Sequence, residues 1–177
     1  MKISNELQHR LICPVTKEKL NHQYDYLQSV EDSSIRYPFI DDIPILINNE
    51  KSLFSIKDFE NKIDTTWDLK TSKLKTIIRG LAPGIGLNIK AKRNYEKLCK
   101  LINKNAKILV IGGSIKGEGM DVVYSNDLFE VVGSDVSFGP YTKVISDAHM
   151  IPFEDETFDF VVVQAVLEHV LNPQRCV

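Results

Sequence analysis

Short, largely apolar runs recur from residue 107 to the end of the chain, separated by polar turns. They are Ile108–Ile111, Glu130–Val132, Lys143–Ile145 and Phe158–Val163. Runs this short are not amphipathic helices, and continuous apolar strands are typical of a parallel sheet covered on both faces. Met120–Phe129 can supply a crossover helix, and such crossovers are right-handed as a rule. The pattern therefore predicts an α/β fold with about four parallel strands.

A different spacing precedes these runs. From Ser55 to Arg79, apolar residues recur near helical spacing and predict a helix. They are Ile56, Phe59, Ile63, Trp67 and Leu74. Gly80–Gly86 breaks this helix, and Asn88–Asn103 predicts a second one. One face of the second helix would present Tyr95, Leu98, Cys99, Leu101 and Ile102. Such positions are more often core than cofactor contacts.

The first fifty residues read as short strand-like pieces separated by turns. Examples are Tyr24–Val30 and Tyr37–Ile47, where prolines fit strand edges or turns. We therefore predict three parts: a β-rich module over residues 1–49, a helical linker over 50–105, and a partial Rossmann-like sheet over 106–177.

Composition excludes several classes of protein. Hydrophobic residues make up 43% of the 177, which is ordinary for a globular protein. Met1–Glu6 has no apolar signal region, and no apolar run is long enough to span a bilayer. Cys13, Cys99 and Cys176 are isolated, which argues against a disulfide framework. The sequence predicts a cytoplasmic protein without a membrane partner.

The net charge of -2 hides an asymmetry along the chain. Residues 51–107 hold 14 basic and 5 acidic residues, a net +9, whereas residues 108–177 hold 3 and 11, a net -8. The basic segment can be a solvated helical surface, or it can attract an anionic substrate or nucleic acid. Its basic residues are spread out with little aromatic interleaving, which does not favour nucleic acid.

Small residues and acids stand at the ends of the predicted parallel strands. The turn Gly112–Ser114 follows the first strand and lets backbone approach a ligand closely. Asp135, at the end of the second, can accept hydrogen bonds from both hydroxyls of a ribose. Asp147, near the end of the third, can accept from an adenine amino group. In this order, the three features indicate a nucleotide-type Rossmann site.

Two further segments carry a family resemblance. Asp147–Asp159 contains Asp-Ala, an Ile-Pro-Phe loop and Phe-Asp, and Ala165–Val170 follows the next strand. Together they resemble the small-molecule, type 11-like class I methyltransferases that use S-adenosylmethionine, over about residues 106–177. The resemblance implies a Rossmann-like fold, this cofactor and transfer of a methyl group to a small-molecule acceptor.

The same resemblance implies roles for individual residues. Gly112 and Gly113 would contact the amino-acid tail of the cofactor, Asp135 its ribose, and Asp147 with Ala148 its adenine. Gln164 would lie near the methyl donor. The cofactor-binding set implied by the resemblance is Gly112, Gly113, Ser114, Asp135, Val136, Asp147, Ala148 and Gln164.

The glycine turn departs from the family pattern. Val110 replaces the usual acid inside the first strand, and Ser114 replaces the second glycine. Ile115–Gly119 looks like an enlarged loop, from which Glu118 could substitute for the missing acid. The strand acid normally helps to orient the glycine loop and the ammonium of the ligand.

His169, with Glu168 beside it, is the candidate general base if the nucleophile must lose a proton. Alternatively, the pair begins a helix and has structural roles. His149 is expected to contribute backbone and packing near the adenine rather than catalysis.

The amino-terminal module resembles the zinc-ribbon-like activator subunit that partners tRNA and release-factor methyltransferases. The match rests on Cys13-Pro14 and on the segment Tyr37–Leu46. A structural zinc site needs four Cys or His ligands, beginning with C-x-x-C, but Thr16 stands at the second position. His9 and His22 do not complete a site. We therefore predict a metal-free module with Cys13 as a buried small hydrophobe.

The resembled fold has seven strands, and this chain supplies about four. Phe158–Val163 would belong in the centre of that sheet, with a fifth strand beside it. Either the chain is a fragment of a longer protein, which we favour, or a second subunit covers this edge. An exposed apolar edge also predicts self-association.

Three functional hypotheses remain open at this point. The leading one is a methyltransferase or its cofactor-binding part. The runner-up is an inactive binding or scaffold protein with the same fold, favoured by Val110, Ser114 and the early stop. The third is an NAD or nucleotide-sugar enzyme with a similar βαβ unit, against which Asp147 and the loop Ile151–Phe153 argue.

Overall fold

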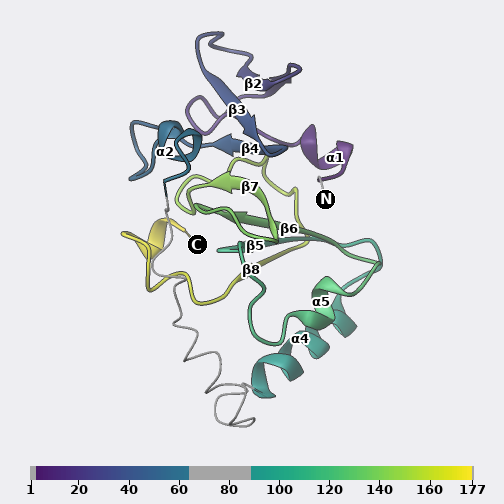
Figure 1. The fold of residues 1–177 in the computed structure, drawn as a ribbon. Helices are drawn as coiled ribbons and strands as arrows, with labels where there is room; N and C mark the ends of the chain where they lie inside the picture. The colour runs from purple at the N-terminus through teal and green to yellow at the C-terminus, as the bar shows by residue number, and fades with distance from the viewer. Residues whose placement is uncertain (1–2, 64–88, 177) are drawn as a thin grey trace.

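The computed structural model describes residues 3–63 and 89–176, and these form an eight-stranded mixed sheet (Figure 1). The strands lie in the order β1-β2-β3-β4-β7-β6-β5-β8. The antiparallel part consists of β1 Leu20–His22, β2 Tyr26–Ser29, β3 Arg36–Ile40 and β4 Ile43–Leu46. The parallel part consists of β5 Lys107–Ile111, β6 Glu130–Asp135, β7 Thr142–Ser146 and β8 Phe160–Val163. The mixed α/β sheet agrees with the predicted fold class.

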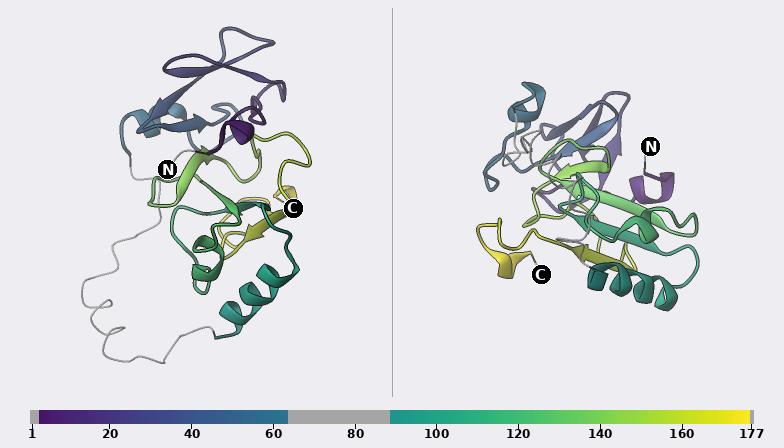
Figure 2. Two further views of the ribbon diagram at one scale, coloured as in Figure 1. Left: turned by 90° about the vertical axis from the view of Figure 1, so that its right-hand side faces the viewer. Right: turned by 60° about the horizontal axis from the view of Figure 1, so that its bottom comes forward.

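Five helical segments accompany the sheet in the described ranges. They are α1 Asn5–Gln8, α2 Ile56–Glu60, α4 Ile89–Leu101, α5 Asp121–Tyr124 and the 3-10 helix Pro173–Arg175. α4 and α5 lie beside each other near the β8 end of the sheet (Figures 1 and 2).

Both faces of the central strands are buried, as their continuous apolar sequence predicts. Ile108 and Val110 of β5 pack with residues of α4 and α5, including Met120 and Val123. The alternate residues of β5 lie in a second cluster with α1 and the loop before β8. That cluster includes Leu109, Ile111, Val132, Val144, Ile3, Leu7 and Phe153.

The amino-terminal strands continue the same sheet. β4 pairs in parallel with β7, through Ile45 with Ile145 and Leu46 with Ser146. The two isoleucines are fully buried and pack with Phe59 of α2. β3 and β4 are joined by Asp41 and Asp42, whose φ angles of 51° and 65° are those of a tight hairpin turn. The sequence did not indicate this junction between the module and the parallel strands.

The first predicted helix is much shorter than expected. α2 begins after Ser55, whose backbone amide donates to Asp58 Oδ2 at 2.7 Å in a capping box. It ends at Glu60, because Lys62 takes a left-handed φ of 51° and Ile63 N–H closes onto Asp58 O. The prediction was therefore wrong for residues 61–63, and its part from 64 to 79 lies outside the described residues.

The second predicted helix is confirmed as α4, Ile89–Leu101. Tyr95, Leu98 and Cys99 pack on the cluster beneath it, together with Ile102. Leu101 does not, since 79% of its surface is exposed, so its assignment to the core face was wrong.

The crossover between β5 and β6 is also shorter than the predicted helix Met120–Phe129. α5 stops at Tyr124, and Asn126 then builds a turn. Its side-chain oxygen accepts from Leu128 N–H at 3.1 Å, and its carbonyl accepts from Phe129 N–H at 3.0 Å. Short polar side chains that bond to nearby backbone compete with helix, which explains the early end.

β8 forms one end of the described sheet. It pairs with β5 on one side, and no other strand of the described ranges pairs with it. Val161 is 58% exposed and Val163 36%, although both are apolar. Within the described ranges, no helix combines the length and apolar character needed to cross a membrane.

Candidate cofactor site

The turn after β5 brings two strands close together. Gly112 has a φ of 70°, and a Cβ there would lie 2.2 Å from a methyl carbon of Val166. A Cβ on Gly113 would lie 2.8 Å from both Gly133 Cα and Val110 O. Gly113 N–H donates to Ser134 O at 3.1 Å. Gly113 requires glycine because backbone atoms already occupy the space of a side chain, whereas Gly112 is favoured by its left-handed φ and by the close Val166 side chain.

Asp135 ends β6 and holds this turn in place. One oxygen, Oδ2, accepts from Ser114 N–H at 2.9 Å. The other, Oδ1, accepts from the backbone amide and the hydroxyl of Ser137 at 3.1 and 3.0 Å. Asp135 therefore ties the glycine turn to the bend after β6. Val136 follows it, half-buried in the bend after β6.

The parallel register brings most predicted residues to one edge. Ile111, the last residue of β5, pairs with Ser134 and with Val163, and Asp135 pairs with Ile145. The carboxyl ends of β5, β6, β7 and β8 therefore lie side by side, which is where ligands bind in open α/β sheets.

Asp147 lies just beyond β7 and is largely enclosed, with 8% of the residue exposed. Its Oδ2 accepts from the Ser52 hydroxyl at 2.6 Å, and its Oδ1 accepts from His149 N–H at 2.9 Å. His149 Nδ1 lies 2.7 Å from the same Oδ1. Burial raises the pKa of this carboxyl, but the hydrogen bonds from Ser52 and His149 outweigh burial and hold the pKa below its usual value.

Residues next to Asp147 connect it to the rest of the chain. Ala148 packs against the core cluster beneath β5 and β6. Asn172 N–H donates to His149 Nε2 at 3.2 Å, so His149 joins Asp147 to the final segment. His149 thus has a positioning role in the structure, and its place near the adenine stays a prediction.

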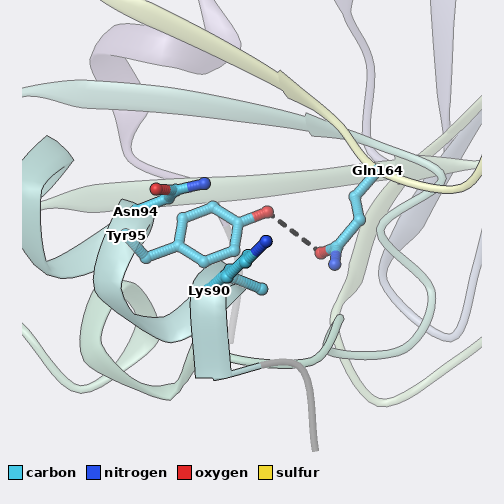
Figure 3. A pocket seen from close by; sticks show the side chains of 5 residues that line it. Lys90, Asn94, Tyr95 and Gln164 are labelled. Atoms are coloured by element: carbon cyan, nitrogen blue, oxygen red, sulfur yellow. Dashed lines mark hydrogen bonds between the residues drawn. The ribbon is translucent and has the colours of Figure 1, made fainter. Parts of the chain in front are cut away.

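Gln164 comes directly after β8 and lines a pocket of about 430 Å³ with Lys90, Ala91, Asn94 and Tyr95 (Figure 3). Tyr95 Oη donates to Gln164 Oε1 at 3.0 Å. Burial raises the pKa of the Tyr95 phenol, so it remains a neutral donor.

His169 is solvent-exposed, in a turn closed by its own N–H to Val166 O at 2.8 Å. Glu168 beside it is exposed as well. Residues 167–169 form a turn, so the alternative expectation that this pair begins a helix was wrong.

Cys13 is fully buried in the amino-terminal module. Its sulfur lies 3.2 Å from the Tyr37 hydroxyl and accepts from Thr16 N–H at 3.4 Å. Burial raises the pKa of this thiol, but hydrogen bonds from Thr16 and Tyr37 outweigh burial and lower it overall. Among the described residues, no group of three His, Cys, Asp or Glu side chains is placed to hold a metal ion.

Sequence reasoning missed three residues of this region. Ser52 lies 95 positions before Asp147, and the sequence around either residue does not predict their contact. Tyr95 was assigned to the core face of its helix, which hid the role of its hydroxyl. Lys90 looked like one of many exposed lysines, and only the fold places it in a pocket.

Comparison with known proteins adds one family. Residues 117–177, about a third of the chain, match the model of a family described as "Methyltransferase domain". The match supports a class I S-adenosylmethionine-dependent methyltransferase domain in this part of the chain. No curated protein matches the sequence.

Proposed function

We propose that this chain binds S-adenosylmethionine at the carboxyl edge of β5 and β6 and serves methyl transfer to a small-molecule acceptor. The observation that carries the proposal is the glycine turn after β5, tied to Asp135 by the Ser114 amide at 2.9 Å. The turn and Asp135 lie in the sheet to which the matched segment 117–177 contributes β6, β7 and β8.

Asp135 retains capacity for a ligand. An ionised carboxylate offers about four acceptor sites, and protein donors use three of those on Asp135. A ribose hydroxyl can take the remaining site without releasing the loop. Gly112 and Gly113 present backbone without side chains to the amino-acid tail, and Val136 supplies an apolar contact beside the ribose.

The proposed adenine side is more crowded. Asp147 already accepts from Ser52 and His149, and its side chain is only 11% exposed. An adenine amino group would therefore share Oδ2 with the Ser52 hydroxyl or displace it. Ala148, next to Asp147, would contribute backbone and a small apolar surface.

When bound, the cofactor would supply an already activated methyl group, so orientation of the acceptor can provide much of the rate. Gln164 would lie beside the methyl donor, held by Tyr95 and by its own contact to Glu118 O at 3.5 Å. His169, on the exposed turn after β8, would accept a proton from acceptors that must lose one.

Calorimetric titration with S-adenosylhomocysteine tests this proposal. The wild-type chain should bind, and Asp135→Asn should weaken binding by roughly tenfold or more, because it loses a charged acceptor. Asp127→Asn, a change at an exposed turn, is the matched control and should bind as the wild type does. Failure of the folded wild-type chain to bind would sink the proposal.

The second candidate function is that of a binding or scaffold protein that has the same fold but does not transfer methyl groups. The contacts of Asp147 favour it. A carboxylate satisfied by Ser52 and His149 is suited to a structural role. Transfer of labelled methyl from S-adenosylmethionine to small molecules of a cell extract separates the two. Cofactor binding with no labelled product would favour a binding or scaffold protein.

A further inference from the structure

The pocket beside Gln164 is built to receive negative charge. Among the described residues that line it, none is an acid, and Lys90 is the ionised side chain. Lys90 and Asn94 bring five N–H donors between them, whereas the Tyr95 hydroxyl proton is already donated to Gln164 Oε1. Figure 3 shows Lys90, Asn94 and Tyr95 on one helix, with the Tyr95 hydroxyl hydrogen-bonded to Gln164. At about 430 Å³, the pocket has the size of a small-molecule site.

The pocket adjoins the glycine loop. A Cβ on Gly117 would lie 2.1 Å from Gln164 Oε1, so the loop after the glycine turn touches the pocket wall. Gln164 itself follows Val163, which pairs with Ile111 immediately before Gly112. A molecule in this pocket would therefore lie next to the proposed methyl donor.

The helix that lines the pocket is strongly basic. α4 carries Lys90, Lys92, Arg93, Lys97 and Lys100 against one acid, Glu96. The neighbouring acid Asp121 forms an ion pair with Lys116, and the charge of Lys92 also lowers the pKa of Asp121. Lys90 and Asn94 are exposed, and basic side chains around a cleft attract anions from solvent.

We propose that this pocket binds the carboxylate of an anionic methyl acceptor, with Lys90 as its counter-ion and Asn94 as a second donor. Tyr95 is a positioning residue, because its hydroxyl holds Gln164 at the pocket wall. The inference rests on the proposed function and deepens it by naming the class of acceptor.

Nuclear magnetic resonance of the full chain provides the test, with the Gln164 side-chain amide as reporter and Gln164→Leu to assign it. Benzoate is the anionic probe, and benzamide has the same shape without the charge. Benzoate should shift the Gln164 signal saturably, whereas benzamide should not. Lys90→Gln should raise the dissociation constant of benzoate about three- to tenfold. Lys100 lies near the other end of α4, roughly 15 Å along its axis. Lys100→Gln should therefore keep the dissociation constant of benzoate within about twofold of the wild-type value.

Equal shifts by benzoate and benzamide, or no effect of Lys90→Gln, would overturn the inference. Calorimetry with S-adenosylhomocysteine then measures the cofactor affinity of each variant. This affinity distinguishes a failure of the acceptor site from a failure of the proposed function. We expect Lys90→Gln to bind S-adenosylhomocysteine as the wild type does. If Lys90→Gln lost affinity for benzoate and for S-adenosylhomocysteine equally, Lys90 would be assigned to the carboxylate of the cofactor, and the acceptor site would be overturned. Cofactor binding without benzoate binding would overturn the acceptor site alone. Benzoate binding without cofactor binding would overturn the proposed function and the acceptor role with it.

Discussion

Asp135 and Asp147 are the same residue type at the ends of neighbouring parallel strands, but their surroundings differ. Asp135 is half-buried and accepts from the loops on either side of it, whereas Asp147 is nearly enclosed. Strand ends can be predicted from the apolar pattern, so both positions were predictable. Their hydrogen-bond partners were not, because Ser52 reaches Asp147 only after the chain has folded.

The pKa of Asp147 leads to a prediction about stability. Because it is lower in the folded chain than the unfolded value of about 3.9, its ionised form stabilises the fold above that pH. This contribution should be lost as the pH falls through the folded pKa. The unfolding free energy of the wild type relative to Asp147→Asn should therefore shrink by about 1 kcal/mol between about pH 6 and pH 3.

Urea unfolding at a series of pH values measures this difference. Asp127→Asn serves as the control, since its side chain lies at an exposed turn, and its difference from the wild type should stay constant. A wild-type advantage over Asp147→Asn that is independent of pH would mean that Ser52 and His149 do not favour the ionised carboxylate.

At the scale of elements, the parallel strands were predicted to within three residues at each end. β6 runs beyond its apolar residues to Asp135, because small residues at Gly133 and Ser134 pair with Val110 and Ile111. The helices were predicted less well. α2 and α5 end where Lys62 and Asn126 make local backbone turns, and these local bonds do not disturb the apolar spacing on which the predictions relied.

The close approach of Gly113, in the turn that follows β5, to Gly133 of β6 gives the second prediction. Gly113→Ala should destabilise the chain by about 2–3 kcal/mol, because the new Cβ would meet backbone atoms of Gly133 and Val110 that cannot move aside. Gly117→Ala is the matched control. Its Cβ would meet the end of the Gln164 side chain, which can rotate, so we expect a change below about 1 kcal/mol.

Thermal or urea unfolding of the two variants checks this contrast. Similar losses for both would show that the backbones of β5 and β6 separate at little cost. The contact could then not be a fixed part of the proposed cofactor site.

At the scale of the whole molecule, one sheet joins the amino-terminal strands to the strands of the candidate site. The predicted boundary between residues 49 and 50 falls just after β4, and the division into three parts remains a prediction. The parallel pairing of β4 with β7 could not be predicted, because a buried apolar strand does not specify which other strand it joins.

The edge at β8 gives the third prediction. An apolar strand with exposed Val161 and an unpaired side in the described sheet should drive self-association through β-strand pairing. Val161→Lys should raise the dissociation constant at least about tenfold, since a charge at the edge would be buried on pairing.

Sedimentation velocity over a range of concentrations measures this association. Tyr24→Lys, a change at a fully exposed residue between β1 and β2 at the opposite end of the sheet, should leave it unaltered. Equal effects of the two substitutions would assign association to general surface chemistry rather than to β8.

The pairing of β4 with β7 also bears on the order of folding. Ile45 and Ile145 are 100 residues apart in sequence, so closing this contact costs more chain entropy than forming the hairpins β1–β2 and β3–β4. During synthesis the hairpins can form early, but the open side of β4 must wait for residues near 146 to emerge. A newly made chain therefore carries an unpaired strand until residues near 146 have been made, and chaperones that recognise exposed apolar strands would act in that interval.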